Sequence, residues 1–275
     1  MDINQLKFPI RSDKLSMNVH VSAELESIQT DFQKIQIVET EAFGRVLLLD
    51  GHIQLTELDE HAYHEALVQV PALSVPSLET ALVIGGGDGG VIRELCKHPA
   101  LDRVDMVEID EGVVQTCRNH LPFVSNGAFD DQRVHLHVAD AFEFVKNSQE
   151  LYDLIVVDCT DVYEEEDGAL SEMLFTEQFY RDISDRLSPT GFVVTQADNL
   201  LFCPYSLDHL LKLYGSIFDR TGSYFAVVPS FGGFSGFCWG SHGAGLLPEM
   251  RHSDLGLRYL NPITYAYGMT GRPIN

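Results

Sequence analysis

The chain has 275 residues, of which 45% are hydrophobic, and its 41 acidic residues against 18 basic ones give a formal net charge of −23. This composition excludes a disordered chain and favours one large folded domain with a smaller one. No apolar run approaches the roughly 18 residues that a membrane span needs. The negative charge disfavours nucleic acid and anionic membranes as partners, and it either attracts small polycations or serves solubility alone.

The cysteines and the first residues bear on where the protein works. The five cysteines are scattered, odd in number and without C-x-x-C spacing, which favours reduced thiols over a disulfide framework or a zinc site. The opening segment MDINQLKFPIRSDKL lacks the basic-then-apolar pattern of a secretion signal. We therefore expect a cytoplasmic protein.

Residues 1–56 are expected to form a small antiparallel β domain. Three segments in it are rich in β-forming residues with partial alternation of polar and apolar side chains. These segments are residues 19–27, 32–39 and 45–49. The pair Asp50-Gly51 after the third segment is typical of a tight hairpin turn.

A helix over residues 58–70 should follow, with Thr56 and Asp59 as start signals and Pro71 as a stop signal. Tyr63 on this helix is a candidate hydrogen-bonding or amine-positioning group, or else an ordinary packing residue. His61 and His64 have the i,i+3 spacing of two metal ligands on one face. The sequence shows no third or fourth ligand nearby, so no metal site is expected.

Strands and helices alternate in the remainder, residues 57–275. Strands are expected at 81–85, 103–109, 133–138, 153–158, 191–196 and 223–228, and helices at 90–98, 111–120, 141–147, 175–186 and 206–217. Apolar strands without alternation imply a parallel sheet covered by helices on both faces. We therefore predict an α/β fold with a doubly wound, mostly parallel sheet of the Rossmann-like, methyltransferase type.

A glycine-rich turn follows the first of these strands. Gly85, Gly87 and Gly90 satisfy the G-x-G-x-x-G spacing of a nucleotide-binding turn between a strand and a helix. Glu108 ends the next strand, where a carboxylate can accept both hydroxyls of a ribose. Asp88 lies where a diphosphate would bind in a dinucleotide enzyme, and it would repel one. The ligand is therefore expected to be a nucleoside with a cationic tail, unless Asp88 is only a structural acid of the turn.

Acids follow four successive strands, at the sheet edge where ligands of such folds bind. They are Asp88, Glu108 to Asp110, Asp140 and Asp158 to Asp161. The pair Asp158 and Asp161 suits a diamine, because one carboxylate can hold the distal ammonium while the other accepts a proton from the reacting nitrogen. A loop that merely caps the next helix is the alternative. The acidic stretch 162–174 after it is either a lid or a solvated loop.

Several segments together resemble the polyamine aminopropyltransferase family, above all its bacterial spermidine synthases. They are residues 48–57, 59–65, 83–90, 107–110, 158–161, 174–180, 194–196 and 257–262, in collinear order over nearly the whole chain. The GGGDGG turn combined with a D-x-x-D after the fourth strand is specific to the family, while neither is specific alone.

The resemblance implies an enzyme that transfers an aminopropyl group from decarboxylated S-adenosylmethionine, a co-substrate rather than a tightly bound cofactor, to an amine. It releases 5′-methylthioadenosine, and the family is usually dimeric or tetrameric. Asp158 would be the general base, with Tyr63 beside it. The implied donor and nucleoside contacts are Gln33, Gln54, His64, Gly85, Gly87, Asp88, Glu108, Asp140 and Ala141. The implied acceptor contacts are Tyr63, Asp158, Asp161, Gln196 and Phe231.

Two departures from the family concern the acceptor. Val162 stands where a proline usually follows Asp161, and Phe231 stands where the family commonly has a tyrosine. Loss of that hydroxyl removes a hydrogen bond worth about 0.5 to 1.5 kcal/mol. Putrescine, giving spermidine, is the first expected acceptor, with agmatine, cadaverine or spermidine as alternatives. An S-adenosylmethionine-dependent methyltransferase and a non-catalytic polyamine-binding homologue are the alternatives from other classes.

Overall fold

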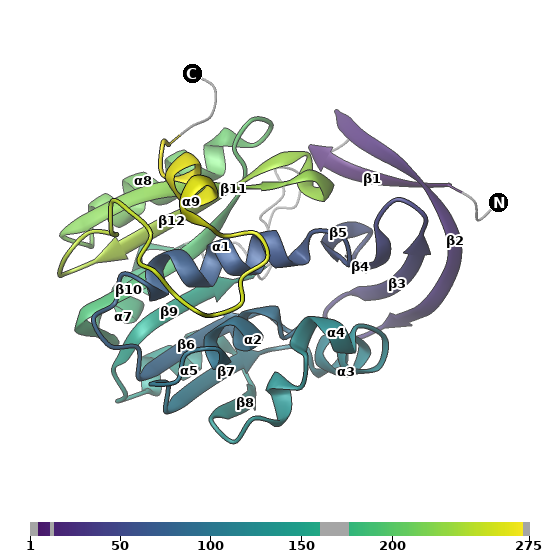
Figure 1. The fold of residues 1–275 in the computed structure, drawn as a ribbon. Helices are drawn as coiled ribbons and strands as arrows, with labels where there is room; N and C mark the ends of the chain where they lie inside the picture. Colours follow the sequence, from purple (N-terminus) through teal and green to yellow (C-terminus); the bar gives the residue numbers. More distant parts are fainter. Residues whose placement is uncertain (1–4, 12–13, 160–175, 272–275) are drawn as a thin grey trace.

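The computed structural model describes residues 5–11, 14–159 and 176–271, and it contains two sheets joined by a central helix (Figure 1). The first is a five-stranded antiparallel sheet and the second a seven-stranded one. Among the described residues, no helix is long and apolar enough to cross a membrane.

The five strands of the N-terminal sheet pair in chain order. They are β1 (Gln5–Arg11), β2 (Leu15–Gln29), β3 (Lys34–Thr40), β4 (Gly44–Leu49) and β5 (His52–Thr56). The expected hairpin is confirmed, because Leu49 pairs with His52 and both turn residues, Asp50 and Gly51, have positive φ. Strand β1 was not predicted, and β2 is longer than expected.

One face of this sheet packs on helices of the second part of the chain. Ile35 and Ile37 of β3 and Leu47 of β4 are fully buried in one apolar cluster with Val113 and Leu121. These last two belong to the helical region of α3 (Glu111–His120) and α4 (Pro122–Ser125). The N-terminal sheet is thereby docked beside the loops that follow β6 (Thr80–Gly85) and β7 (Arg103–Glu108).

Helix α1 (Glu60–Ala72) joins the two sheets and differs from its prediction at both ends. The prediction that Pro71 stops it is wrong, because Pro71 lies inside its last turn. A proline leaves the carbonyl four residues earlier without its helical N–H. Here the Tyr224 hydroxyl lies 2.9 Å from the Ala66 carbonyl oxygen and 3.4 Å from that of Leu67, and supplies a donor instead.

The seven-stranded sheet has the order β11-β12-β10-β9-β6-β7-β8, with a parallel core from β10 to β8. Its other strands are β8 (Val134–Val138), β9 (Tyr152–Asp158), β10 (Leu187–Asn199), β11 (Arg220–Val228) and β12 (Gly233–Ser241). The predicted fold class, a doubly wound and mostly parallel sheet with a small antiparallel N-terminal sheet, is confirmed.

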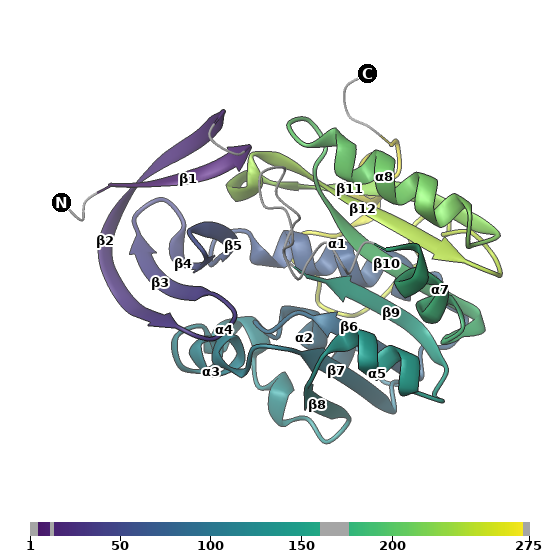
Figure 2. The ribbon, with the colours of Figure 1, turned by 180° about the vertical axis from the view of Figure 1, so that it is seen from behind.

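Helices cover both faces of this sheet. In Figure 1, α1, α2 (Gly90–Cys96) and α9 (Pro262–Gly268) lie on one face, and Figure 2 shows α5 (Ala141–Asn147), α7 (Glu177–Ser184) and α8 (Pro204–Gly215) on the other. Alternate strand residues feed the two cores: Ala81 and Val83 belong to one cluster, whereas Leu82 and Ile84 belong to the other.

Strand β12 was not predicted, because its glycines are typical of a loop. It pairs antiparallel with both β10 and β11. A Cβ at Gly236 would lie 2.3 Å from a Leu200 side-chain carbon, and one at Gly240 would lie 2.5 Å from the Phe218 ring. The glycines therefore leave room for side chains packed across the strand, which only the folded structure reveals.

The C-terminal segment is anchored to α1 by one buried carboxylate. Glu65 accepts hydrogen bonds from the backbone N–H groups of Arg258, Tyr259 and Leu260 at 2.7, 2.8 and 2.8 Å. The side chain is almost fully buried, and these three donors offset its loss of water. Because Tyr63 and His64 lie on the same helix, this contact also fixes the part of α1 that reaches the site described next.

Candidate active site

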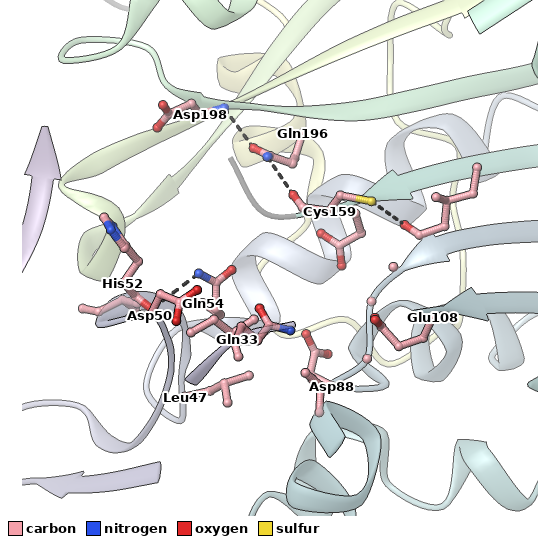
Figure 3. A pocket seen from close by; sticks show the side chains of 18 of the residues that line it. Gln33, Leu47, Asp50, His52, Gln54, Asp88, Glu108, Cys159, Gln196 and Asp198 are labelled. Atoms are coloured by element: carbon pink, nitrogen blue, oxygen red, sulfur yellow. Dashed lines mark hydrogen bonds between the residues drawn. The ribbon is translucent and has the colours of Figure 1, made fainter. Parts of the chain in front are cut away.

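A cavity of about 470 Å³ lies at the carboxyl ends of the parallel strands, covered by the N-terminal sheet (Figure 3). Most residues singled out from the sequence line it. These are Gln33, Gln54, Tyr63, Gly85, Gly87, Asp88, Glu108, Asp140, Ala141, Asp158, Gln196 and Phe231. Asp161, Val162 and the acidic stretch 162–174 lie outside the described residues.

The glycine turn joins the ends of β6 and β9. Gly85 has a φ of 79°, and a Cβ there would lie 2.3 Å from the carbonyl oxygen of Asp158. The same oxygen accepts a hydrogen bond from Gly86 N at 3.0 Å. A side chain at position 85 would clash with the backbone of Asp158, so only glycine fits there. The glycine turn and the end of β9 therefore lie in direct contact.

Three strand-end acids share one local geometry: each accepts a hydrogen bond from the backbone N–H two residues further on. The distances are 2.6 Å from Gly90 N to Asp88 Oδ1, 2.9 Å from Asp110 N to Glu108 Oε1 and 2.8 Å from Phe142 N to Asp140 Oδ1. Such turns fix the carboxylates in place without a ligand. All three acids also line the cavity.

Glu108 is the most deeply buried of the three. Burial raises its pKa to about 7, opposed by the backbone N–H of Asp110 and assisted by the negative charge of the Asp110 carboxylate. A Cβ at Gly87 would lie 2.9 Å from Glu108 Oε2, so glycine leaves that oxygen accessible. A ligand that donates hydroxyl protons would stabilise this carboxylate in its charged form.

Two glutamines reach the cavity from the opposite side: Gln33 from the turn between β2 and β3, and Gln54 from β5. Gln33 donates to Asp110 Oδ2 at 3.0 Å, and Gln54 donates to the carbonyl of His52 at 3.4 Å. Asp110 also caps α3 by accepting from Gly112 N. Asp110 is therefore a structural acid that ties the N-terminal sheet to the loop after β7.

Asp158 forms its side-chain hydrogen bond with a distant helix. The Tyr63 hydroxyl donates to Asp158 Oδ1 at 2.6 Å. Burial and the negative charge of Asp88 raise the pKa of Asp158 to about 6, although His64 and the Tyr63 hydrogen bond oppose the change. The result is a carboxylate that changes protonation near neutral pH, as a general base requires.

The far side of the cavity is formed by β10 and the short 3-10 helix η2 (Pro229–Phe231). Gln196 donates to the carbonyl of Cys159 at 3.0 Å and accepts from Asp198 N at 3.0 Å. Figure 3 shows Gln196 and Asp198 on the opposite side of the cavity from Asp88 and Glu108. The ring of Phe231 meets that of Tyr63 edge-on, with centroids 5.6 Å apart.

Sequence reasoning missed Asp198. It lines the cavity with a φ of 57°, and burial raises its pKa to about 6. The signal that could have found it is the same as for the other acids, since it follows the apolar part of β10. The expected strand there ended at residue 196, but β10 continues to Asn199.

Asp59 anchors the loop that carries Phe231. It occupies the N-cap position of α1 but makes no side-chain cap; instead, its two oxygens accept from Ser230 N and Ser230 Oγ, both at 2.8 Å. The Thr56 hydroxyl also donates to it at 2.6 Å. The start signal at Asp59 therefore marks a tertiary contact as well as a helix boundary.

His64 lies behind Asp88 rather than in the cavity wall, with only 1% of its surface exposed. The sequence showed no further ligand for the pair His61 and His64, but the fold brings Asp88 and Asp158 to His64, with ligand-type atoms of the three within 4.8 Å of one another. However, Nδ1 lies 2.7 Å from Glu60 Oε2 and Nε2 lies 3.3 Å from Asp88 Oδ1. Each ring nitrogen therefore lies within ion-pair distance of a carboxylate, and a protonated ring has no lone pair to offer a metal.

The chain is similar to known proteins over most of its length. The family model for the spermine/spermidine synthase domain matches residues 60–244, and the model for the spermidine synthase tetramerisation domain matches residues 8–57. A polyamine aminopropyltransferase of Leptospira biflexa serovar Patoc is 35% identical over 251 residues, 90% of this chain and 87% of the relative. A polyamine aminopropyltransferase of Bacillus mycoides is 41% identical over 215 residues, which cover 78% of this chain and 76% of the relative.

Two solved structures share the fold. A spermidine synthase in complex with the transition state analogue AdoDATO superposes with a TM-score of 0.89 at 26% identity, covering 98% of this chain and 92% of that chain. The spermidine synthase from Thermotoga maritima gives a TM-score of 0.87 at 26% identity, covering 98% and 91%. These matches favour the aminopropyltransferase prediction over the methyltransferase and the non-catalytic alternatives. The chain belongs to the spermine/spermidine synthase family of polyamine aminopropyltransferases, and it is an enzyme.

Proposed function

We propose that the protein transfers the aminopropyl group of decarboxylated S-adenosylmethionine to putrescine, giving spermidine and 5′-methylthioadenosine. The observation that carries this proposal is one cavity in which Asp158, a partly buried carboxylate whose pKa is raised to about 6, lies beside Asp88 and shares the lining with Glu108. Such a site can hold a cationic tail and deprotonate an amine next to it.

The donor would occupy the part of the cavity lined by the glycine turn. In this arrangement Glu108 accepts from the ribose hydroxyls, and Asp140 binds the adenine amino group beside Ala141. Gln33 and Gln54 cover the nucleoside from the N-terminal sheet. Asp88 holds the ammonium of the aminopropyl tail, where a carboxylate on the donor would be repelled.

The reaction is a displacement at the aminopropyl carbon that is bound to the sulfonium. The lone pair of the acceptor nitrogen forms the new carbon–nitrogen bond, and the carbon–sulfur electron pair leaves with the sulfur as neutral 5′-methylthioadenosine. Asp158 accepts the proton that the nitrogen loses, and the Tyr63 hydroxyl orients that carboxylate. Catalysis then depends on alignment and on keeping the attacking nitrogen neutral.

The acceptor would extend past Tyr63 toward Gln196 and Phe231. Asp161, which the sequence places on the loop after β9, completes the acceptor contacts in this proposal. Phe231 offers the acceptor an apolar face, which suits the methylene chain of a diamine. Agmatine, cadaverine and spermidine are the alternative acceptors.

Three wider assignments belong to the same proposal. The chain divides into a β domain of residues 1–56 and a catalytic domain of residues 57–275. It assembles as a homodimer or homotetramer, which the tetramerisation-domain match to residues 8–57 supports. It works in the cytoplasm without a tightly bound cofactor, and its partners are small amines rather than nucleic acid or membranes.

The test is product analysis with decarboxylated S-adenosylmethionine and a panel of diaminopropane, putrescine, cadaverine, agmatine and spermidine. We expect release of 5′-methylthioadenosine with the highest kcat/KM for putrescine and spermidine as its product. A higher kcat/KM for another amine would replace putrescine as acceptor, and no turnover with any amine would overturn the proposed function. Calorimetry should show tighter binding of the decarboxylated donor than of intact S-adenosylmethionine.

A further inference from the structure

Four charged side chains form a buried array that ends at the cavity. The His64 ring bridges Glu60 and Asp88 through its two nitrogens, at 2.7 and 3.3 Å. Glu60 in turn accepts from Arg93 at 3.1 Å on one oxygen and 2.9 Å on the other. Arg93 also donates to the carbonyl of Val124 at 2.6 Å, which fixes the outer end of the array.

The fold makes specific room for this array. A Cβ at Gly90 would lie 2.3 to 2.5 Å from three atoms of the His64 ring, so the third glycine of the nucleotide-binding turn is required by that ring. Glu60 and His64 are only 4% and 1% exposed. Gly90 N also donates to Asp88 Oδ1, the oxygen nearest His64. Gly90 thus helps to fix the positions of both the His64 ring and the Asp88 carboxylate.

The array keeps His64 positively charged. Burial by itself lowers the pKa of His64, but the charge of Asp88 and the hydrogen bonds with Asp88 and Glu60 outweigh it and raise the pKa to about 10. For Glu60, burial acts to raise the pKa, while His64 and Arg93 lower it to about 2. At neutral pH the His64 ring is then protonated and the Glu60 carboxylate is ionised.

Two carboxylates beside one cavity cannot both ionise freely, because each disfavours the charge of the other. Oxygens of Asp88 and Asp158 lie within 4.8 Å of each other and of His64. Of these two carboxylates, Asp88 forms the ion-pair contact with His64, at 3.3 Å, whereas Asp158 receives the Tyr63 hydroxyl. The cation therefore favours charge on Asp88 over charge on Asp158.

We propose that His64 and Glu60 are positioning residues that divide the protonation states of the two carboxylates. The His64 imidazolium holds Asp88 as the fixed anion for the cationic tail of the donor, and Asp158 is left as the group that takes up a proton. Glu60, backed by Arg93, keeps the ring protonated and oriented. This inference rests on the roles proposed above for Asp88 and Asp158.

The pH dependence follows from the groups around Asp158. Among the described residues, the titratable groups that interact with Asp158 are Tyr63 and His64 of α1, Asp88 of the turn after β6, and Cys159. Those that interact with His64 are Asp88 and Glu60, and Glu60 is paired with Arg93 of α2. A base works only when deprotonated, so kcat/KM should fall as the pH drops below about 6, the pKa of Asp158. The His64 cation lowers the pKa of Asp158, so its loss should move this acid limb to higher pH.

The first experiment compares pH–rate profiles of the wild type and His64→Gln. We expect the acid limb of kcat/KM to move up by about one pH unit, since loss of a nearby opposite charge changes a carboxylate pKa by roughly 1 to 3 units. KM for the decarboxylated donor should rise about 10-fold or more as Asp88 loses its partner. A folded His64→Gln protein with an unmoved acid limb would overturn the proposal.

The second experiment needs no turnover and applies to the wild type. Nitrogen NMR of the His64 imidazole should show both nitrogens protonated at pH 8, and Glu60→Gln should lower the pH at which the ring titrates. Glu94→Gln is the matched control: Glu94 is fully buried and also pairs with Arg93, at 3.0 Å, but its other partners are Lys97 and Gln69. It should leave the ring's titration unchanged.

A neutral His64 ring at pH 8 would overturn the proposal. So would a change in the pH of ring titration that is as large in Glu94→Gln as in Glu60→Gln. A neutral ring whose signals change on addition of Zn²⁺ would assign His64, Asp88 and Asp158 to a metal instead. Failure of the wild type to turn over any amine would defeat the proposed function, while the ring titration would still be measured, so the two failures are distinguishable.

Discussion

The proposed donor end of the cavity (Asp88, Glu108 and Asp140) is built from local turns, whereas Asp158 and Phe231 at the proposed acceptor end are held by contacts between distant segments. Each donor-end acid accepts from a backbone N–H two residues further along the chain. Asp158 instead accepts from the Tyr63 hydroxyl, 95 positions away. Phe231 follows Ser230, and Ser230 is held by Asp59, which lies 171 positions earlier in the chain.

The difference separates two properties of the enzyme. The geometry of the proposed donor end is set by the same local contacts that form the strand–turn–helix units of the sheet. The acceptor end depends on η2 and α1, whose contacts can change without moving the glycine turn. In the proposed function, the acceptor contacts can therefore vary while the donor contacts stay the same.

The largest effect is expected at the acceptor end. Asp158→Asn should lower kcat by about 10²- to 10⁴-fold, because the amide cannot accept the proton of the attacking nitrogen. Since the pKa of Asp158 is raised to about 6, its ionisation above that pH disfavours the folded state, and the neutral amide should not lower Tm at pH 8. Near-normal turnover in a folded variant would remove Asp158 from the role of base.

A smaller effect, on binding rather than on turnover, is expected at the donor end. Glu108→Gln should weaken binding of 5′-methylthioadenosine by about 10- to 100-fold, because a hydrogen bond to a charged group is worth roughly 1.5 to 3 kcal/mol. Calorimetry measures this, and Glu111→Gln, an exposed glutamate on α3, is the matched control. Unchanged affinity in Glu108→Gln would contradict the assignment of the ribose to this residue.

The smallest effect tests the acceptor end alone. Phe231→Tyr should lower KM for putrescine by about 2- to 10-fold, corresponding to one neutral hydrogen bond of about 0.5 to 1.5 kcal/mol. Donor affinity should stay the same, since Phe231 lies on η2, on the far side of the cavity. An equal change in donor affinity would show that the two ends are not independent.

Much of the scaffold was predictable because its signals are local. The D–G hairpin, the apolar strands and the glycine turn depend on backbone conformation and on periods of a few residues. The helix expected at residues 141–147 was found with the same bounds, Ala141–Asn147, and Asp140 caps it. The strand-end acids were found for the same reason, since parallel strands bring their carboxyl ends to one edge.

Other features had signals that were present but misleading. Pro71 normally ends a helix, yet α1 continues through it because Tyr224 from β11 supplies a donor to the carbonyls of its last turns. The glycines of β12 are typical of a loop until Leu200 and Phe218 are placed against them. In each case a side chain from another element reverses a local preference.

The sequence by itself determined the α/β fold, the edge of the sheet that carries the site and the acids of the donor end, because these depend on neighbouring residues along the chain. Only the tertiary structure decided that Tyr63 meets Asp158, that Asp59 holds the loop of Phe231 and that His64 lies buried between Glu60 and Asp88. Most of these contacts join residues many positions apart. Their geometry follows from how the elements pack, which no local pattern encodes.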